Sequence, residues 1–479
     1  MMSTRNRSRI SIRRKKLFGE YLTPRELFRK YIEPEIKDLI YEYVWVDLFA
    51  GEGDLILPIL NLVPMDRRID FFAKHIYLFD IQSIMVERAI EKASRYGIPR
   101  HVAEKNIIQR DTLLNYPKFI FEKDLPIYHI TNPPYLYIGY IAKHEETHDL
   151  LKYFSGENKG YQDLYQVALA NDMRHGVEKM IYVIPTNFFF GYSVSNKIRR
   201  DLLKIYIVKK VYFFEKQIFR DTGTNVAICF FERKKIPGQE PQIFEGYKVT
   251  GSGEMVKRRY ILRPENNYRA GDEFNEFVKR LRSSRPLRIK FYLTLNEVSR
   301  NRGDYAVEII DANSYSKGGY SKRIIYVNKE LYDKIRSNIL FVKTLDTGSL
   351  DGRAGLYVIR DVFGVDGILV TKSPYRTHPI QIFIEPRLSE EEQILLMKYF
   401  NLILEYLREL TDSEFMTTYK YSNSLYTRKY LGLKQVRKLI ETFPWLELDD
   451  SEKRFFRDLV LSGEVSRLLE FLRKRRSII

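Results

Sequence analysis

Four short apolar segments, each closely followed by a polar side chain and separated by stretches of helical character, constrain the fold of this chain most strongly. They are residues 43–46, 76–79, 106–109 and 125–130, followed by Asp47, Asp80, Asp111 and Asn132. Strands that alternate with helices require a parallel sheet with crossover connections. In an open sheet of this kind the ligand lies beyond the carboxyl ends of the strands, where these polar residues fall. Residues 17–236 are therefore predicted to form an α/β domain around a parallel sheet.

The segment Asn132-Pro133-Pro134-Tyr135 carries the groups needed to hold an amino group on a planar ring. Such an amine is a weak nucleophile because its lone pair is delocalised, so both amino hydrogens must be held as the nitrogen becomes tetrahedral. The amide oxygen of Asn132 and the carbonyl of Pro133 can accept them. The prolines fix φ and remove two donors, and Tyr135 offers a face for stacking on a base. A rigid turn after a strand is the alternative interpretation.

A glycine loop, Asp47-Leu48-Phe49-Ala50-Gly51-Glu52-Gly53-Asp54, follows the first apolar segment. Gly51 and Gly53 permit backbone conformations and a close ligand approach that a Cβ forbids. The third glycine of the dinucleotide fingerprint is absent, so an adenosyl ligand without phosphate fits better. Asp80 can hold ribose hydroxyls and Asp111 can accept from an adenine amino group. For a single aspartate at a strand end, a turn or capping role is the alternative.

In their order, these segments resemble the gamma class of DNA adenine-N6 methyltransferases, bacterial and archaeal enzymes usually found in restriction-modification systems. The matching segments are Gly19–Pro24 (motif X), Asp47–Gly53 (I), Asp80 (II), Asp111 (III), Asn132–Tyr135 (IV), Gln162–Tyr165 (V), Ile184–Phe189 (VI), and Ile218-Phe219 with Thr224–Phe231 (VIII). Motif II usually carries Glu in this class, so Asp80 has a shorter reach to the ribose. The resemblance covers residues 17–233 and is weak beyond them.

The resemblance implies the architecture and the site. It implies a seven-stranded Rossmann-like class I S-adenosylmethionine-dependent methyltransferase domain (17–236), preceded by a basic arm (1–16) and followed by an α+β target-recognition domain with a helical C-terminal part (237–479). Asn132, Pro133, Pro134 and Tyr135 would be catalytic, with Tyr135 and Phe219 stacking on a flipped adenine, although core packing is an alternative role for Phe219. S-adenosylmethionine would contact Tyr21, Thr23, Asp47, Phe49, Ala50, Gly51, Gly53, Asp80, Ile81, Asp111, Thr112, Asn132 and Pro134.

The formal charge of +18 and the pI of about 9.5 favour a polyanionic partner, which we expect to be double-stranded DNA. Two windows without acidic residues, 415–440 and 277–296, are the predicted phosphate contacts, although each could be a solvated basic face. The residues predicted to bind DNA within these windows are Lys420, Arg428, Lys429, Lys434, Arg282 and Arg285. The loops 313–321 and 372–378 are further segments predicted to enter a groove.

A single cysteine, Cys229, excludes an intrachain disulfide and a zinc site built from thiolates, and no metal site is expected. Carbon-5 cytosine methyltransferases need a nucleophilic Cys beside a Pro, whereas Cys229 lies between Ile228 and Phe230 in a strand-like run, where core packing is expected. We find no apolar segment long enough to span a bilayer and no signal peptide, which predicts a cytoplasmic protein. A monomer is the favoured oligomeric state.

The expected activity is methyl transfer from S-adenosylmethionine to the 6-amino group of a flipped adenine. Motif X begins at Gly19 and a recognition-sized region follows the catalytic segments, which favours a stand-alone type II enzyme that protects DNA beside a separately encoded endonuclease. Cytosine-N4, RNA and protein-glutamine methyltransferases remain alternatives, as does a DNA-binding protein with a decayed site. The basicity and the large C-terminal region argue against glutamine as the substrate. The recognition sequence is not predicted.

Overall fold

The computed structural model describes residues 25–191, 193–215, 218–219, 225–316, 319–346, 352–372, 379–411 and 431–476. Within these ranges the chain forms two compact units that divide between Ala270 and Gly271. The sequence analysis places the boundary between residues 236 and 237 instead. The difference arises because the strands that follow residue 241 continue the sheet of the first unit.

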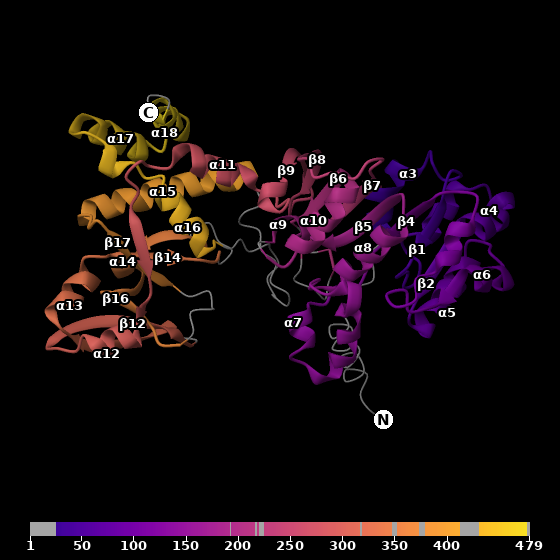
Figure 1. The fold of residues 1–479 in the computed structure, drawn as a ribbon, viewed down its shortest axis with the longest axis horizontal. Coiled ribbons are helices and arrows are strands. Elements are labelled where there is room, and N and C mark those ends of the chain that lie inside the picture. Colours follow the sequence, from indigo (N-terminus) through magenta and orange to yellow (C-terminus); the bar gives the residue numbers. More distant parts are fainter. Residues whose placement is uncertain are drawn as a thin grey trace. The chain divides into compact units, whose positions relative to one another are not determined.

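In the described part of the first unit, nine strands form one sheet in the order β3-β2-β1-β4-β5-β7-β6-β8-β9 (Figure 1). The first five are parallel neighbours, and β7 is antiparallel to both β5 and β6. The strands are β1 (Val44–Asp47), β2 (Ile76–Asp80), β3 (Ile107–Gln109), β4 (Ile127–Thr131), β5 (Lys179–Pro185), β6 (Tyr206–Phe214), β7 (Val226–Arg233), β8 (Gln242–Val249) and β9 (Met255–Leu262). The α/β class and the antiparallel end of the sheet are thus confirmed.

Helices connect the parallel strands, as crossovers require. The described helices of this unit are α2 (Arg25–Leu27) and α3 (Glu33–Ile36), which precede β1, and then α4 (Arg68–His75), α5 (Ser83–Ser94), α6 (Arg100–Asn106), α7 (Ile138–Ile141), α8 (Leu164–His175), α9 (Asn187–Phe190) and α10 (Asn196–Ile205). Every residue of β1 and β4 is buried, as expected of central strands covered on both faces. Helix α8 is buried from Leu164 to Asp172, so it lies inside the unit rather than on its surface.

Strands β8 and β9 extend the predicted seven-stranded sheet by two. Gln242 at the start of β8 is buried, and its side chain accepts from the backbone N–H of Val208 (3.0 Å) and donates to the carbonyls of Leu203 and Tyr206 (2.8 Å each). The Pro/Gly-rich segment before it also folds back, since the N–H of Gly238 donates to the carbonyl of Lys204 (2.9 Å). This segment is therefore a turn between two strands of one sheet and not a domain linker.

The second unit contains two four-stranded sheets, ordered β10-β17-β14-β15 and β11-β16-β12-β13, in its described residues. Their strands are β10 (Arg288–Phe291), β11 (Leu293–Thr294), β12 (Tyr305–Ser316), β13 (Gly319–Val327), β14 (Leu340–Lys343), β15 (Gly355–Val358), β16 (Gly367–Val370) and β17 (Ile380–Glu385). The helices are α11 (Asp272–Leu281), α12 (Leu295–Arg300), α13 (Lys329–Arg336), α14 (Ile359–Phe363), α15 (Glu390–Thr411), α16 (Leu433–Ile440), α17 (Asp450–Ser462) and α18 (Val465–Arg476). This matches the predicted mixture of short strands followed by helices.

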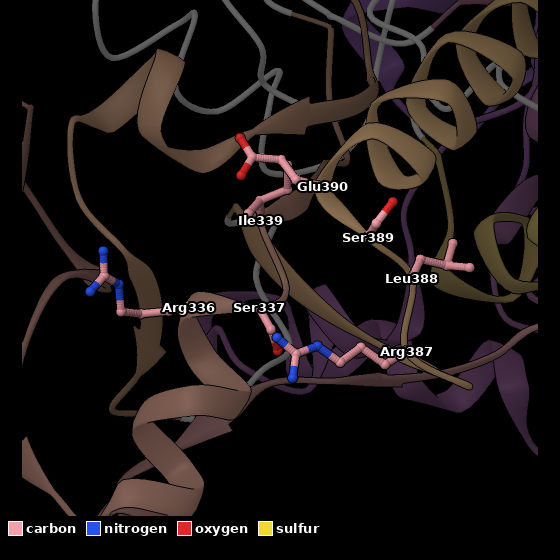
Figure 2. A pocket seen from close by; sticks show the side chains of 7 residues that line it. All are labelled: Arg336, Ser337, Ile339, Arg387, Leu388, Ser389 and Glu390. Carbon is pink, nitrogen blue, oxygen red and sulfur yellow. The ribbon is translucent and has the colours of Figure 1, made fainter.

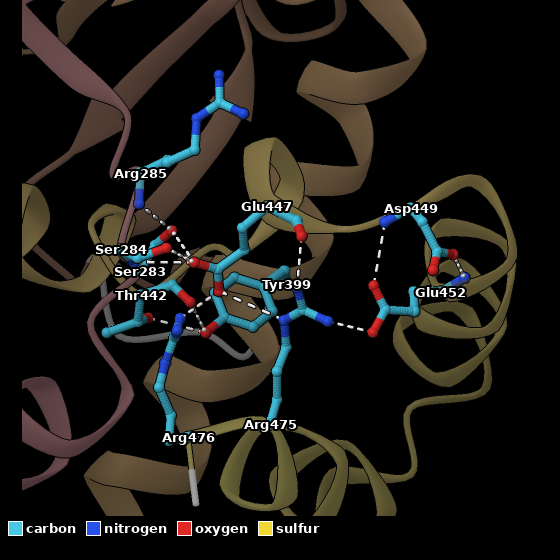
Figure 3. A network of polar contacts seen from close by, with 10 residues as sticks. All are labelled: Ser283, Ser284, Arg285, Tyr399, Thr442, Glu447, Asp449, Glu452, Arg475 and Arg476. Carbon is cyan, nitrogen blue, oxygen red and sulfur yellow. Dashed lines mark hydrogen bonds and ion pairs between the residues drawn. The ribbon is translucent and has the colours of Figure 1, made fainter. Parts of the chain in front are cut away.

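A buried carboxylate attaches the last helix of this unit to its first segments (Figure 3). Glu447 accepts from the Ser283 hydroxyl (3.0 Å), from the N–H and hydroxyl of Ser284 (2.8 and 2.6 Å) and from the Arg476 guanidinium. Burial alone would raise the pKa of Glu447, but the hydrogen bonds from Arg476, Ser284 and Ser283 outweigh it and lower the pKa. The network joins segments about 160 residues apart, which fixes the C-terminal helix on the core.

Candidate active site at the carboxyl edge of the sheet

The glycine loop leaves β1 after Asp47 with two glycines in the left-handed region. Gly51 has φ +54° and Gly53 has φ +80°. A Cβ on Gly53 would lie 2.7 Å from Cδ1 of Leu57, so both the backbone conformation and the packing exclude a side chain there. The sharp turn brings the chain back against β2, where the N–H of Ala50 donates to the carbonyl of Phe79 (2.8 Å). The loop is therefore fixed at the edge where a ligand is expected.

The peptide groups of Leu48 are held from two sides by side chains of neighbouring elements. Its N–H donates to Nε2 of His129 on β4 (3.1 Å), and its carbonyl accepts from the hydroxyl of Thr112 (2.8 Å). Thr112 is buried in this role, which positions the glycine loop rather than facing a ligand directly. The start of the loop is thus tied to both β4 and the segment after β3.

Below the loop, His129 is oriented by the buried carboxylate of Asp172 on α8. Nδ1 of His129 contacts Oδ2 of Asp172, which also accepts from the hydroxyl of Tyr182 (2.7 Å), while Oδ1 accepts from Tyr116 (2.8 Å). When Nδ1 of His129 carries the ring proton and donates it to Asp172, Nε2 is unprotonated and can accept from the N–H of Leu48. The sequence analysis missed His129 and Asp172, although a histidine inside an apolar strand is a signal that could have indicated such a buried pair.

Asp47 connects the glycine loop with the end of β4. Its Oδ1 accepts from the N–H of Phe49 (2.9 Å) and from the hydroxyl of Thr131 (2.6 Å), the residue directly before Asn132. Burial raises the pKa of Asp47 to about 6, against the opposing effect of these hydrogen bonds. Asp47 therefore acts through the loop geometry in this structure, and its contact with a cofactor stays a prediction.

We expect the isosteric change Asp47→Asn to remove a pH dependence of stability. The folded state binds the proton of Asp47 more readily than the unfolded chain, whose aspartates titrate near 3.8, so the free energy of unfolding falls as the pH rises from 3.8 to about 6. Two pKa units correspond to on the order of 3 kcal/mol. Urea midpoints of the cofactor-free protein measured across this range should decline less in the variant than in the wild type. Parallel curves would contradict the assignment.

Asp80 and Asp111 lie at the predicted edge and are already engaged by the protein. Asp80 accepts from the N–H groups of Gly51 (2.9 Å) and Gln82 (2.8 Å), and burial raises its pKa. Asp111 accepts from the hydroxyl of Tyr153 (2.8 Å). Next to Asp80, Ile81 is 52% exposed, an apolar surface beside the glycine loop. Because β3, β2 and β1 are adjacent, these residues share one edge with Asp47, and their ligand roles stay predictions.

The Asn132–Tyr135 loop begins at the same edge, directly after β4. Asn132 is partly exposed and Pro133 is buried. Tyr135 is only 1% exposed, and its hydroxyl donates to the carbonyl of Val183 (2.6 Å) while also contacting Oδ1 of Asn132. In this conformation the ring of Tyr135 presents almost no surface for stacking, and its hydroxyl occupies the acceptor predicted for the target amine. An amine bound at Oδ1 of Asn132 would therefore compete with the Tyr135 hydroxyl, which has the carbonyl of Val183 as its second partner.

The segment predicted as motif V is joined by two hydrogen bonds to the residues that directly follow this loop. The carboxylate of Asp163 accepts from the N–H of Leu136 (2.8 Å), and the carbonyl of Gln162 accepts from the N–H of Ile138 (2.9 Å). Phe219, the second predicted stacking residue, is 3% exposed, so it too is packed in this conformation. Tyr21, Thr23, Lys420, Arg428 and Lys429 lie outside the described residues.

Parts of the two basic windows lie together in the second unit. The guanidinium of Arg282 pairs with Glu441 at 3.0 Å, the backbone N–H of Ser283 donates to the carbonyl of Glu441 (2.8 Å), and the guanidinium of Arg437 lies 5.2 Å from the ring centre of Phe291. Arg285 and Lys434 are both exposed. Residues 277–296 and 433–441 therefore form one basic surface, although they are far apart in sequence.

A pocket of about 380 Å³ lies in the second unit, between the end of α13 and the start of α15 (Figure 2). Its lining residues include Arg336 at the end of α13 and Arg387 in the segment before α15, and in Figure 2 the Arg387 side chain extends toward Ser337. Arg336 also donates to the hydroxyl of Tyr332 (2.5 Å) and pairs with Asp366 at 3.7 Å. The pocket contains no residue of the predicted cofactor or base site, so it is separate from the chemistry discussed above.

The fold and the site together define the class of protein. The strand order β3-β2-β1-β4-β5-β7-β6, with β7 antiparallel, a glycine loop after β1 and an Asn-Pro-Pro-Tyr loop after β4, is that of class I S-adenosylmethionine-dependent methyltransferases. The model of the N-6 DNA Methylase family matches residues 9–317, more than half of the sequence, and the chain belongs to this family.

Solved structures with some similarity come from restriction-modification systems. A modification subunit attributed to a type I restriction enzyme of Vibrio vulnificus YJ016 is 16% identical, with a TM-score of 0.36 over 68% of this chain and 62% of that one. The EcoKI M protein is 14% identical (TM-score 0.34, 70% and 68%), and the type IIG endonuclease BpuSI is 12% identical (0.43, 95% and 62%). The chain thus spans less than two thirds of two of these proteins. No curated protein matches the sequence.

Family membership rests on the sequence match over residues 9–317, since these structural similarities are low. Among the helices of the described residues, none is both long and apolar enough to cross a membrane.

Proposed function

We propose that this protein is a site-specific DNA methyltransferase that transfers a methyl group from S-adenosylmethionine to the 6-amino group of a flipped adenine in double-stranded DNA. The observation that carries the proposal is the position of the Asn132–Tyr135 loop. It begins next to the residue, Thr131, whose hydroxyl binds Asp47 at the base of the glycine loop. The hydrogen bond between Thr131 and Asp47 thus connects the loop that carries the predicted amine acceptors with the glycine loop that is predicted to bind the cofactor.

The residues at this edge fit an adenosyl cofactor. Gly51 and Gly53 leave the backbone open to close approach, Ile81 offers an exposed apolar surface for an adenine ring, and Asp80 offers carboxylate oxygens within reach of a ribose. When bound, S-adenosylmethionine supplies its methyl group as an electrophile on a positively charged sulfonium. The nearby carboxylates of Asp47 and Asp80 suit that positive charge.

The chain's own contribution to the reaction is positioning. Oδ1 of Asn132 and the carbonyl of Pro133 would accept the two amino hydrogens of the target base and orient its nitrogen toward the methyl group that the cofactor supplies. The two prolines and the hydrogen bond from the N–H of Leu136 to Asp163 stiffen the backbone of this loop, while the Tyr135 hydroxyl competes with the base for Oδ1 of Asn132. Tyr135 and Phe219 stack on the flipped base once it enters. Cys229 takes no part, because it is fully buried in β7 and burial raises the pKa of its thiol.

DNA is bound mainly by the second unit. Its described basic surface, with Arg282, Arg285 and Lys434, contacts phosphates together with Lys420, Arg428 and Lys429. We place the protein as the stand-alone, type II protective partner in a restriction-modification system, acting as a monomer beside a separately encoded endonuclease.

The proposal is tested by expressing the protein in cells that lack adenine methylation and sequencing their plasmid DNA by a method that detects modified bases. We expect N6-methyladenine at every copy of one short sequence. Detection of N4-methylcytosine instead would show that the target base is cytosine. Unmodified DNA from cells that contain folded protein would refute the proposed function. Purified protein incubated with S-adenosylmethionine and the same plasmid provides the matching measurement in vitro.

A further inference from the structure

A buried carboxylate stands at the centre of the sheet β11-β16-β12-β13 in the second unit. Asp311 on β12 is 1% exposed. It accepts from the N–H of Asn313 (3.0 Å) and the hydroxyl of Thr371 (2.9 Å) through Oδ1, and from a guanidinium nitrogen of Arg323 (2.6 Å) through Oδ2. These donors come from the end of β12, the segment after β16, and β13. Asp311 therefore fixes three neighbouring segments at one point.

Arg323 is the one partner in this cluster that is both charged and open to solvent. Its side chain is 48% exposed, whereas that of Asp311 is 2% exposed. A guanidinium carries five N–H donors in a planar fork, and Asp311 takes up one nitrogen of this fork. The side chain is thus half exposed to solvent while the buried carboxylate holds one end of its fork. A mobile surface arginine would lose more side-chain entropy on binding a ligand.

The element that carries Arg323 is a two-stranded antiparallel ribbon at the edge of its sheet, with basic residues in its far half. β12 and β13 pair antiparallel, and β13 is the edge strand of the sheet. Among the described residues of the far half of this ribbon (311–316 and 319–323), Asp311 is the sole acid, and Lys322 and Arg323 are basic. Tyr315 is 68% exposed at its end, near the Ser314 and Ser321 hydroxyls, which lie 2.9 Å apart. The major groove of DNA admits a two-stranded ribbon of this kind.

We propose that Arg323, held by Asp311, reads a guanine in the recognition sequence from the major groove, and that Asp311 is its positioning residue. A guanine presents N7 and O6 as two acceptors that match the fork of an arginine. A phosphate contact needs only a positive charge and would not require a buried carboxylate to fix the plane of the guanidinium. This inference rests on the proposed function, since it presumes a DNA substrate.

The test is the recognition sequence of an Arg323→Ala variant, determined by sequencing DNA methylated in cells. We expect one position at which the wild type requires guanine to accept other bases, with discrimination at that position falling by about 5- to 150-fold. Arg323→Lys keeps the charge but lacks the fork, so it should relax the same position, and Asp311→Asn should relax it more weakly. Thermal melting of each variant establishes that it is folded.

Two comparison variants separate base reading from phosphate binding. Arg467→Ala removes an exposed arginine of α18 that is paired with Glu464, and it should leave the recognition sequence unchanged. Lys434→Ala should lower the slope of log K for DNA binding against log salt concentration by about one, and it should leave the sequence preference unchanged. If Arg323→Lys keeps the full wild-type specificity, or if Arg323→Ala weakens binding equally on all sequences with a lower salt slope, the inference is overturned. Absence of methylation by the wild type would instead refute the proposed function.

Discussion

The change Asn132→Ala should lower the rate of methyl transfer by at least about 10²–10³-fold, the loss typical when one preorganised hydrogen-bonding group is removed from a reaction centre. The alanine cannot accept an amino hydrogen, so the amine lone pair stays delocalised in the ring. Binding of S-adenosylmethionine and of DNA should remain close to normal, because Asp47, Gly51 and the basic surface are untouched. Single-turnover rates, calorimetry with the cofactor and DNA binding assays measure the three quantities separately.

Two companion variants make this result specific. Asn61→Ala removes an exposed asparagine of the same unit and should retain wild-type turnover. Tyr135→Phe keeps the ring but removes the hydroxyl that contacts Oδ1 of Asn132, so it should retain most of the activity because Oδ1 stays available to the target amine. Near-normal turnover by Asn132→Ala would remove the residue from the mechanism. Equal losses of activity and of cofactor binding would assign the residue to cofactor binding and not to the target amine.

The sheet and the edge of the site could be predicted because their signals are local. An apolar run of four or five residues followed by a polar side chain is visible in the sequence, and parallel strands bring their carboxyl ends to one edge whatever their order. β1, β2 and β4 thus place Asp47, Asp80 and Asn132 where the sequence analysis expects them.

The boundary near residue 236 shows where local signals fail. Residues 234–241 have the composition of a linker, yet β8 pairs with β6 and Gln242 reaches back to Leu203. Polar and apolar residues alternate along β8 and could have indicated a strand, but the partner of that strand is set by contacts between distant segments. The same limit applies to His129 and Asp172, which are 43 residues apart and meet only in the folded chain.

The conformation of Tyr135 could not be read from the sequence either. Its aromatic ring indicates stacking, but its hydroxyl finds Val183, a residue 48 positions away, and the ring is buried in the absence of a base. Under the proposed function, a flipped adenine would have to displace this packing, so part of the binding free energy of the base would be used to open the site.

The second large effect is expected from Asp172→Ala, because this change removes the acceptor shared by Tyr116, Tyr182 and His129. Buried donors that lose their partner destabilise a protein by about 1–3 kcal/mol each, and losses for broken buried charged pairs reach about 3–5 kcal/mol. We expect the free energy of unfolding to fall within the latter range in urea titrations. We also expect the affinity for S-adenosylmethionine to fall by at least about tenfold, which corresponds to a loss of about 1.4 kcal/mol in binding free energy.

The cofactor measurement distinguishes positioning from general stability. Nε2 of His129 accepts from Leu48 only while Nδ1 is held by Asp172, so the variant frees the start of the glycine loop even when the rest of the unit stays folded. Tyr116→Phe and Tyr182→Phe each remove one donor and leave Asp172 bonded to His129, so they should lower stability by about 1 kcal/mol and keep the cofactor affinity. Asp149→Ala, an exposed aspartate of the same unit, should change neither quantity. Normal cofactor affinity in folded Asp172→Ala would show that the carboxylate stabilises the core without orienting the loop.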